Sequence, residues 1–465
     1  MTHEALIVLP AGVPWVLAAL LTFLDGRKRW VGLLGAAGLA ASLASLVWLA
    51  VVVLREGTVE TVAGGWPEGV GISLRADALG VTFAAVSVVV VLASLLYEVA
   101  LGVRWRAFPP LVLLLVAGLN GLFLTGDTFN FYVFFEISMT AAFVLAGYRE
   151  EDYQVRAAFV FAVVNLLGSV IFLSGVTVLY NITGSLDMAE VAARTDRLEP
   201  SSVIVVAVVI FSAFCLKLGL FPFHFWLPAV YVGSHPPVAA ILSGALANIG
   251  SYGLLRFGGG ILPRELALGA VAVMALGAAS IVYGALQAIS RRDTSEVMAY
   301  SAIGQVGYIL LALGIGGPVG FTAAVVYSVV NSLNKGVVFL AAGLRGPLVG
   351  AAFAVGAFSI AGVPPAAGFV GKMAVFKAAI SEGPVATGAL LVALVFVGSA
   401  LSFLYSFQVY QRRFLAPQDG EKPSALAARL PVFVLAALLL LLGLWPEPLV
   451  YVSQAAADAL SGGSG

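Results

Sequence analysis

The chain has 465 residues, of which 61% are hydrophobic and only 10% charged, with 24 basic and 24 acidic side chains. Its mean hydropathy of +1.04 excludes a soluble globular protein and is typical of membrane proteins with many spans. The connecting segments are too short to bury a hydrophobic core of their own, so no separate soluble domain is expected.

Apolar runs long enough to cross a bilayer recur along the whole chain. A helix needs roughly 20 residues to span the hydrocarbon core, and about 14 runs reach that length. They lie near 5–24, 30–54, 78–98, 107–125, 130–147, 156–180, 203–232, 237–258, 266–289, 295–315, 318–343, 350–381, 386–411 and 429–450. We therefore predict an all-α, polytopic membrane protein in which the segments 203–232 and 350–381 are broken helices.

Basic residues are distributed unevenly between alternate connections. The connections on the side of Arg27 to Arg29 contain 14 of the 24 lysine and arginine residues. Cytoplasmic loops carry such an excess, so we predict a protein of the inner (cytoplasmic) membrane with both termini facing away from the cytoplasm. On the opposite side, residues 58–75 alternate in polarity and contain Gly-Gly and Trp-Pro, which predicts a short hairpin.

The first broken helix carries a lysine. Lys217 lies near the end of an apolar run that then meets Pro222 and Pro228, which interrupt helical hydrogen bonding. A lysine in hydrocarbon costs about 3 kcal/mol on insertion scales, and freed backbone groups persist only where they line protein or a water-filled cavity. The two interpretations are a proton or cation path and an ammonium that extends to the headgroups. The apolar and aromatic residues after Lys217 favour the path.

The second broken helix has the reverse order, because Lys372 follows Pro364 and Pro365. The two segments are the seventh and the twelfth of the 14 spans, and because this offset of five is odd, one would be inverted relative to the other, as in transporters built from inverted repeats. Lys377 lies near the helix end at Glu382, where extension to the headgroups explains it equally well.

Two further charges lie deep in apolar runs. Glu136 lies in FNFYVFFEISMTAAFVLAG, where a carboxylate must be neutral or paired with a cation, and Lys217 is the natural partner. Lys335 follows Asn331 by four residues and adjoins Asn334, which makes one helix face polar at bilayer depth. The chemistry of the chain is therefore expected at these intramembrane charges.

Groups that would hold a redox centre are scarce. The chain has three histidines and one cysteine, Cys215, which lies in an apolar helix, and it has no glycine-rich nucleotide fingerprint. We expect no cofactor, no metal site, no nucleic-acid partner and no enzymatic activity of the chain itself.

Six segments carry a specific resemblance. They read GDTFNFYVFFEIS, KLGLFPFHFWLPAVY, PVAAILSGALANIGSYGLLRF, EVMAYSAIGQVGYI, NSLNKGVVFLAAG and IAGVPPAAGFVGKMAVF. They resemble the signature segments of the antiporter-like subunits shared by Mrp-type multisubunit cation/proton antiporters, the membrane arm of respiratory complex I and energy-converting membrane hydrogenases. The resemblance spans roughly residues 70–415 and is greatest to the Mrp D subunit.

The resemblance implies a proton-translocating subunit of a multisubunit Na+/proton antiporter. Its partners would be other membrane subunits, the lipid bilayer, protons and a monovalent cation, with Na+ expected. The matching positions give proton-transfer roles to four residues and place a histidine after the first break: Glu136, Lys217, Lys335 and Lys372, with His224 as the histidine.

The chain also departs from the family pattern. Asn248 stands where most relatives have a second lysine, and Tyr327 and Asn331 stand where many have histidines. An asparagine can hydrogen-bond water but cannot carry a proton as a charge. We therefore expect His224, Asn248, Asn331 and Asn334 to form an auxiliary polar path.

The resemblance also predicts a division of the chain and leaves two alternative functions. The predicted divisions are N-terminal helices over 1–106, a first antiporter-like repeat over 107–258, a second over 259–415, and a C-terminal helix and tail over 416–465. One alternative is a proton-pumping membrane subunit of a complex I-like NADH:quinone oxidoreductase or energy-converting hydrogenase. The other is a non-transporting scaffold paralogue, which the four retained charges disfavour.

Overall fold

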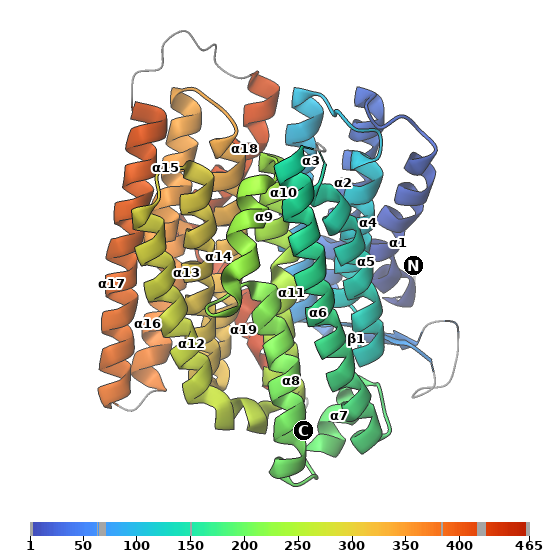
Figure 1. Ribbon diagram of the computed structural model, residues 1–465. Coiled ribbons are helices and arrows are strands. Elements are labelled where there is room, and N and C mark those ends of the chain that lie inside the picture. The colour runs from blue at the N-terminus through green and yellow to red at the C-terminus, as the bar shows by residue number, and fades with distance from the viewer. Residues whose placement is uncertain are drawn as a thin grey trace.

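The computed structural model describes residues 3–62, 64, 71–148, 151–382, 385–415 and 425–461. Within this part of the chain, eleven helices are long and apolar enough to cross a membrane, and three shorter apolar helices complete the 14 predicted spans. Figure 1 shows them as one upright bundle, with the N-terminal helices on the right, α15 to α17 on the left and the last helices, α18 and α19, near the middle. The predicted all-α, polytopic fold is confirmed.

The helices follow one another with short connections. Their bounds are α1 (His3–Thr22), α2 (Arg29–Glu56), α3 (Ala78–Leu101), α4 (Phe108–Phe123), α5 (Thr128–Ala146), α6 (Asp152–Thr183), α7 (Met188–Thr195), α8 (Pro200–Leu218), η2 (Phe223–Trp226), α9 (Leu227–Gly233), α10 (Pro236–Ile241), η3 (Leu242–Leu246), α11 (Asn248–Gly253), η4 (Leu254–Ile261), α12 (Pro263–Ser290), α13 (Thr294–Ile315), α14 (Gly317–Ala342), α15 (Pro347–Ala361), α16 (Ala367–Ser381), α17 (Val385–Tyr410), η5 (Gln411–Leu415), α18 (Leu426–Leu444) and α19 (Glu447–Ser461).

Two ends of the bundle are distinguished by their connections. One end carries the antiparallel hairpin β1 (Val59–Val62) and β2 (Ser73–Ala76), which confirms the predicted hairpin and defines the hairpin face. The other end carries the connection from α1 to α2, with the exposed ion pair between Asp25 and Arg27, and is called the Arg27 face. The hairpin lies at the lower right of Figure 1, and the Arg27 face lies at its upper edge.

Both predicted helix breaks are present, and they run in opposite directions. The chain leaves α8 at Gly219 (φ 62°) and resumes at η2 and α9, and it leaves α15 at Gly362 (φ 78°) and resumes at α16. Glycine enters this left-handed conformation without a Cβ clash, so it ends a helix readily. In Figure 1, α8 and α9 rise from the hairpin face while α15 and α16 descend from the Arg27 face, which is the inverted arrangement predicted.

A third segment is less regular than predicted. The predicted span 237–258 is a helix that changes from α to π winding twice, at η3 and at η4, on either side of α11. This helix is almost completely enclosed by its neighbours. Short π segments inside α-helices occur frequently at functional sites, which directs attention to α11.

The predicted C-terminal end of the last span was wrong. The predicted segment 429–450 contains a break, because α18 ends at Leu444 and α19 begins at Glu447. Pro446 cannot donate a backbone hydrogen bond and disfavours helix at the residue before it, which explains the break. After the break, α19 packs against α3 and α14.

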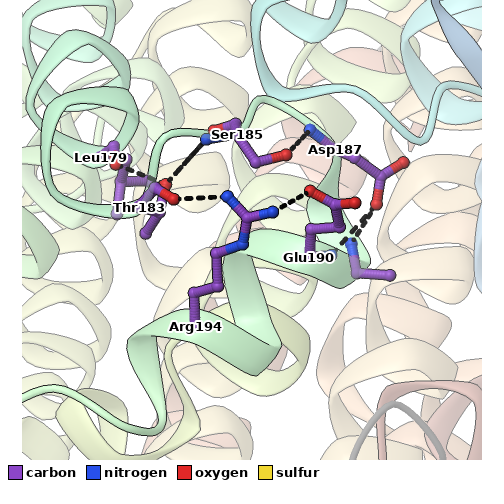
Figure 2. Close-up of polar contacts among 7 residues, drawn as sticks. Leu179, Thr183, Ser185, Asp187, Glu190 and Arg194 are labelled. Carbon is purple, nitrogen blue, oxygen red and sulfur yellow. Dashed lines mark hydrogen bonds and ion pairs between the residues drawn. The ribbon is translucent and has the colours of Figure 1, made fainter. Parts of the chain in front are cut away.

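The connection from α6 to α7 closes the hairpin face (Figure 2). Asp187 caps α7 by accepting hydrogen bonds at its N-terminus, including one from the Glu190 amide at 3.1 Å. Arg194 donates to the Thr183 carbonyl at 2.7 Å and to Glu190 at 2.7 Å. The second Asp187 oxygen accepts from Ser73 of the hairpin at 2.9 Å, so the hairpin, α6 and α7 are held together.

A buried ion pair fixes the start of α3 against η4. Asp77 and Arg256 are 1% and 6% exposed, and their Oδ2 and Nη1 atoms are 2.7 Å apart. Arg256 also donates to the Tyr252 hydroxyl at 3.1 Å, which in turn donates to the Phe123 carbonyl at 3.0 Å. Because each charge is matched by an opposite charge or a hydrogen bond, the cluster sets the geometry of this end of the bundle.

Candidate functional site

Lys217 lies at the end of α8, just before the first break, and is 7% exposed. Its ammonium donates to Asn165 Oδ1 on α6 at 2.9 Å and lies 4.0 Å from the ring centroid of Phe135 on α5. The Asn165 amide is oriented by its own hydrogen bond to the Phe161 carbonyl at 2.8 Å. The ammonium is therefore held by an amide oxygen and an aromatic face, two neutral partners.

Glu136 follows Phe135 on α5 and is half-buried. Among the described residues no direct ion pair between Glu136 and Lys217 forms, and Glu136 Oε1 is buried without a hydrogen-bond partner. The two groups nevertheless lie close enough to interact electrostatically. The structure thus places Asn165, which the sequence analysis missed, at the contact predicted for Glu136. A polar residue within the apolar run 156–180 was the available signal.

A small cavity separates Lys217 from the irregular helix. Its volume is about 10 Å³, and its lining includes Asn165, Lys217 and Ala247. This is about the space that one water molecule needs. Ala247 is the residue before Asn248, so the cavity lies between Lys217 and the helix that carries the predicted polar link.

Asn248 joins three helices through its side-chain amide. Its Nδ2 donates to Ser87 Oγ on α3 at 3.0 Å, and its Oδ1 accepts from Ser332 Oγ on α14 at 2.9 Å. Gly244 permits this approach, because a Cβ there would lie 2.8 Å from the Ser332 carbonyl oxygen. Asn248 therefore lies between the Lys217 region and the helix that carries Lys335.

Lys335 lies in α14, which has the highest buried share of the candidate spans in the described part of the chain, and is 4% exposed. None of the hydrogen bonds found among the described residues involves its ammonium. The carbonyl oxygens of the Asn331 and Asn334 side chains are buried and also lack a partner there. Tyr327, Asn331 and Lys335 recur every four residues, so they share one face of α14.

Lys372 lies on α16, after the second break, and is 2% exposed. Its ammonium donates to the carbonyl of Ala361, the last residue of α15, at 3.1 Å. The break frees this carbonyl from the helix. The ammonium also lies 4.8 Å from the ring centroid of Tyr308. Lys377 is by contrast exposed and borders a cavity of about 680 Å³ towards α19.

Side chains from α13, α14 and α17 form a polar and aromatic cluster next to Lys372. Tyr327 on α14 donates to Gln305 Oε1 on α13 at 2.6 Å, and Gln305 Nε2 donates to Tyr405 on α17 at 3.3 Å. The rings of Tyr327 and Tyr308 are 5.1 Å apart, and Tyr308 contacts Lys372. Gln305 and Tyr405 gave no signal in the sequence, since neither carries a charge at neutral pH.

His224 lies apart from these groups. It is half-buried in η2, and its Nε2 lies 2.8 Å from the hydroxyl of Tyr283 on α12. The contacts found in the described part of the chain do not connect it with any of the three buried lysines. Its assignment to the polar path stays a prediction.

Three almost fully buried lysines, two of them at helix breaks, are an arrangement typical of membrane transport subunits. The family model described as "NADH:quinone oxidoreductase/Mrp antiporter, TM" matches residues 125–402. The chain belongs to this family.

Proteins with known names or structures align with nearly the whole length of this chain. The D subunit of the Na(+)/H(+) antiporter of Alkalihalophilus pseudofirmus is 31% identical over 98% of this chain and 97% of its own length, and that of Bacillus subtilis is 30% identical over the same shares. A chain of the Mrp complex from Dietzia is 28% identical, with a TM-score of 0.91 over 99% of this chain and 98% of its own. A chain of respiratory complex I from Thermus thermophilus is 25% identical, with a TM-score of 0.86 over 99% and 100%.

Proposed function

We propose that the chain is the D-type, proton-translocating subunit of a multisubunit Na+/proton antiporter in the cytoplasmic membrane. The similarity to the D subunits of two Na(+)/H(+) antiporters over 97% of their length supports this proposal. The Arg27 face would be cytoplasmic, because most basic residues of the connections lie on that side. The chain would work with other membrane subunits and would need no cofactor of its own.

The observation that carries the proposal is the burial of Lys217, Lys335 and Lys372 without a carboxylate in contact among the described residues. A buried lysine held only by neutral groups exchanges its proton more readily than one in an ion pair. In the proposed path, groups that can hydrogen-bond would join the three lysines. The path would run from Lys217 through the small cavity to Asn248, and through Ser332 to Lys335.

The second half of the path follows α14 and α13. Ser332 precedes Lys335 by three residues and shares its helix face. Asn331 and Asn334 supply buried acceptors beside Lys335, and buried polar groups require a partner, which here would be water. Tyr327 and Tyr308 then lead towards Lys372. Glu136 would control the entry by its electrostatic effect on Lys217.

Lys335 provides the direct test of this function. Lys335→Ala should lower Na+-dependent proton transport by about 100-fold, the usual effect of losing a proton-transferring side chain. Lys335→Arg should be equally inactive, because arginine keeps the charge but does not release its proton. The measurement is the dissipation of a pH gradient on adding Na+ to inverted vesicles that contain the complete complex. Normal transport with Lys335→Arg would contradict a role in proton transfer.

Asn248 allows a second test. Asn248→Ala removes hydrogen bonds to Ser87 and Ser332 and should slow transport by about tenfold, the equivalent of one or two net hydrogen bonds. Asn248→Lys should be tolerated, because both serine hydroxyls can accept from an ammonium. Assembly is followed by co-purification in mild detergent. If Asn248→Lys prevents assembly, the packing at Gly244 does not admit a lysine.

A second candidate function is proton pumping in a redox-driven complex. The observation in its favour is the likeness to a chain of an archaeal membrane-bound sulfane sulfur reductase, with a TM-score of 0.88 and 26% identity over 98% of this chain. Purification of the native complex decides between the two. Iron–sulfur subunits among the co-purifying chains would favour redox-driven pumping, whereas membrane subunits alone would favour the antiporter.

A further inference from the structure

A second buried carboxylate lies outside the path described above. Glu98, in the last turn of α3 at the Arg27 face, is 1% exposed. Its Oε1 accepts a hydrogen bond from the Tyr148 hydroxyl at 2.6 Å, and its Oε2 lies 3.4 Å from Nδ1 of His235. Tyr148 lies just beyond α5, and His235 directly precedes α10. The end of α3 and two connections at the same face thus bring together three titratable side chains.

The surroundings give Glu98 no permanent counter-charge. Within the described part of the chain, the only ion pair of Glu98 is the one with His235. Arg104 approaches through its backbone amide alone, which donates to the Tyr148 hydroxyl at 2.9 Å. Burial and the neighbouring carboxylate raise the pKa of Tyr148 above its ordinary value, so the phenol remains a proton donor to Glu98. The groups of the cluster that face each other across 3.4 Å are therefore a buried carboxylate oxygen and an imidazole nitrogen.

The cluster lies on the side of α3 that leads to Asn248. Glu98, Ser94 and Ser87 are spaced by four and seven residues, which places them on one face of the helix. Both ends of that face contact the same irregular helix, because Glu98 meets His235 before α10 and Ser87 meets Asn248 in α11. Ser94 is completely buried between them. At a rise of 1.5 Å per residue, the stripe is about 16 Å long.

We propose that Glu98 and His235 form a proton-exchange site at the Arg27 face, and that the Ser94 and Ser87 stripe connects it with Asn248 and Lys335. The ligand of the site is a proton from the aqueous phase on that side. The proposal rests on the proposed function, since it requires that Lys335 exchange protons. It adds a route along α3 that is separate from Lys217 and from the second broken helix.

A purely structural role makes a different prediction. In that case the only role of Glu98 is to hold α3 against the connection after α5, by accepting the hydrogen bond from the Tyr148 hydroxyl. Glu98→Gln preserves this contact, because the amide oxygen has the same position and still accepts, but it cannot take up a proton. The isosteric variant therefore separates proton exchange from structural support.

The experiment compares variants of the complete complex in inverted vesicles, where the Arg27 face would meet the bath. Glu98→Gln should lower Na+-dependent proton transport by about tenfold or more and should flatten its dependence on bath pH. The Na+ concentration for half-maximal rate should not change. His235→Gln should alter the pH profile in the same direction. Asp152→Asn, which removes an exposed carboxylate at the same face, should behave as the unsubstituted chain.

Ser94→Ala tests the stripe, with Ser45→Ala as its control. Both serines are buried and both bond a carbonyl of their own helix, at 2.8 Å and 2.7 Å. Only Ser94→Ala should slow transport.

If Lys335→Arg is inactive while Glu98→Gln keeps its rate and pH profile, the exchange site is overturned and the proposed function stands. If Lys335→Arg is fully active, both fail. A uniformly lower rate with an unchanged pH profile would assign Glu98 a structural role and also overturn the proposal.

Discussion

Lys372→Ala is expected to abolish Na+-coupled proton transport, with a loss of about 100-fold or more, while the complex still assembles. The ammonium is buried and donates to the Ala361 carbonyl that the helix break leaves free. Alanine removes both the proton-exchanging group and the donor at the break. Pro364, Pro365 and Gly362 still terminate the helix in the variant, so assembly should persist. The measurement is pH-gradient dissipation by Na+ in inverted vesicles.

Lys377→Ala is the matched control on the same helix. Lys377 is exposed and borders the cavity towards α19, so its loss should change the rate by less than about twofold. Lys372→Glu should keep part of the activity, because a protonated carboxyl can also donate to Ala361 and can release its proton. Equal activity of Lys372→Ala and the unsubstituted chain would remove Lys372 from the mechanism. A loss confined to Lys377→Ala would move the end of the path to that residue.

Glu136→Ala is expected to have an effect of similar size, again with normal assembly. Glu136 does not contact Lys217 directly, so its action must be electrostatic and must vary with the distance between them. At an effective dielectric constant of 20, moving a unit charge from about 8 Å to about 4 Å changes the interaction by about 2 kcal/mol. This free-energy change corresponds to a change of about 30-fold in the ratio of protonated to neutral Lys217. Loss of this control should stop coupled transport.

The control for Glu136→Ala is the removal of a carboxylate that is not expected to affect transport. Glu190→Gln removes one partner of an exposed ion pair with Arg194 on α7, which contributes little to stability. Asn165→Leu, by contrast, should abolish transport, because it removes the acceptor for Lys217 and leaves a buried ammonium without its hydrogen bond. Unchanged proton flux with Glu136→Ala in an assembled complex would exclude electrostatic control by this residue.

Much of the fold could be predicted because the decisive constraints are local. A bilayer span requires a continuous apolar run, and Pro222 and Pro365 interrupt helices wherever the chain places them. The intramembrane lysines could be identified for the same reason, since a charge in hydrocarbon is costly in any arrangement of helices. The break near the end of the last span was missed, although Pro446, Glu447 and Pro448 interrupt the run 429–450 there.

The sequence by itself determined which segments cross the membrane, where two helices break and that Lys217, Lys335 and Lys372 lie within apolar runs, because each follows from the chemistry of a few neighbouring residues. Only the tertiary structure decided the partners of those charges. Lys217 meets Asn165 from 52 residues away, and Asn248 meets Ser87 from 161 residues away. Such contacts depend on how helices pack, and an uncharged asparagine or serine gives no signal of its partner until packing brings the two side chains within hydrogen-bond distance.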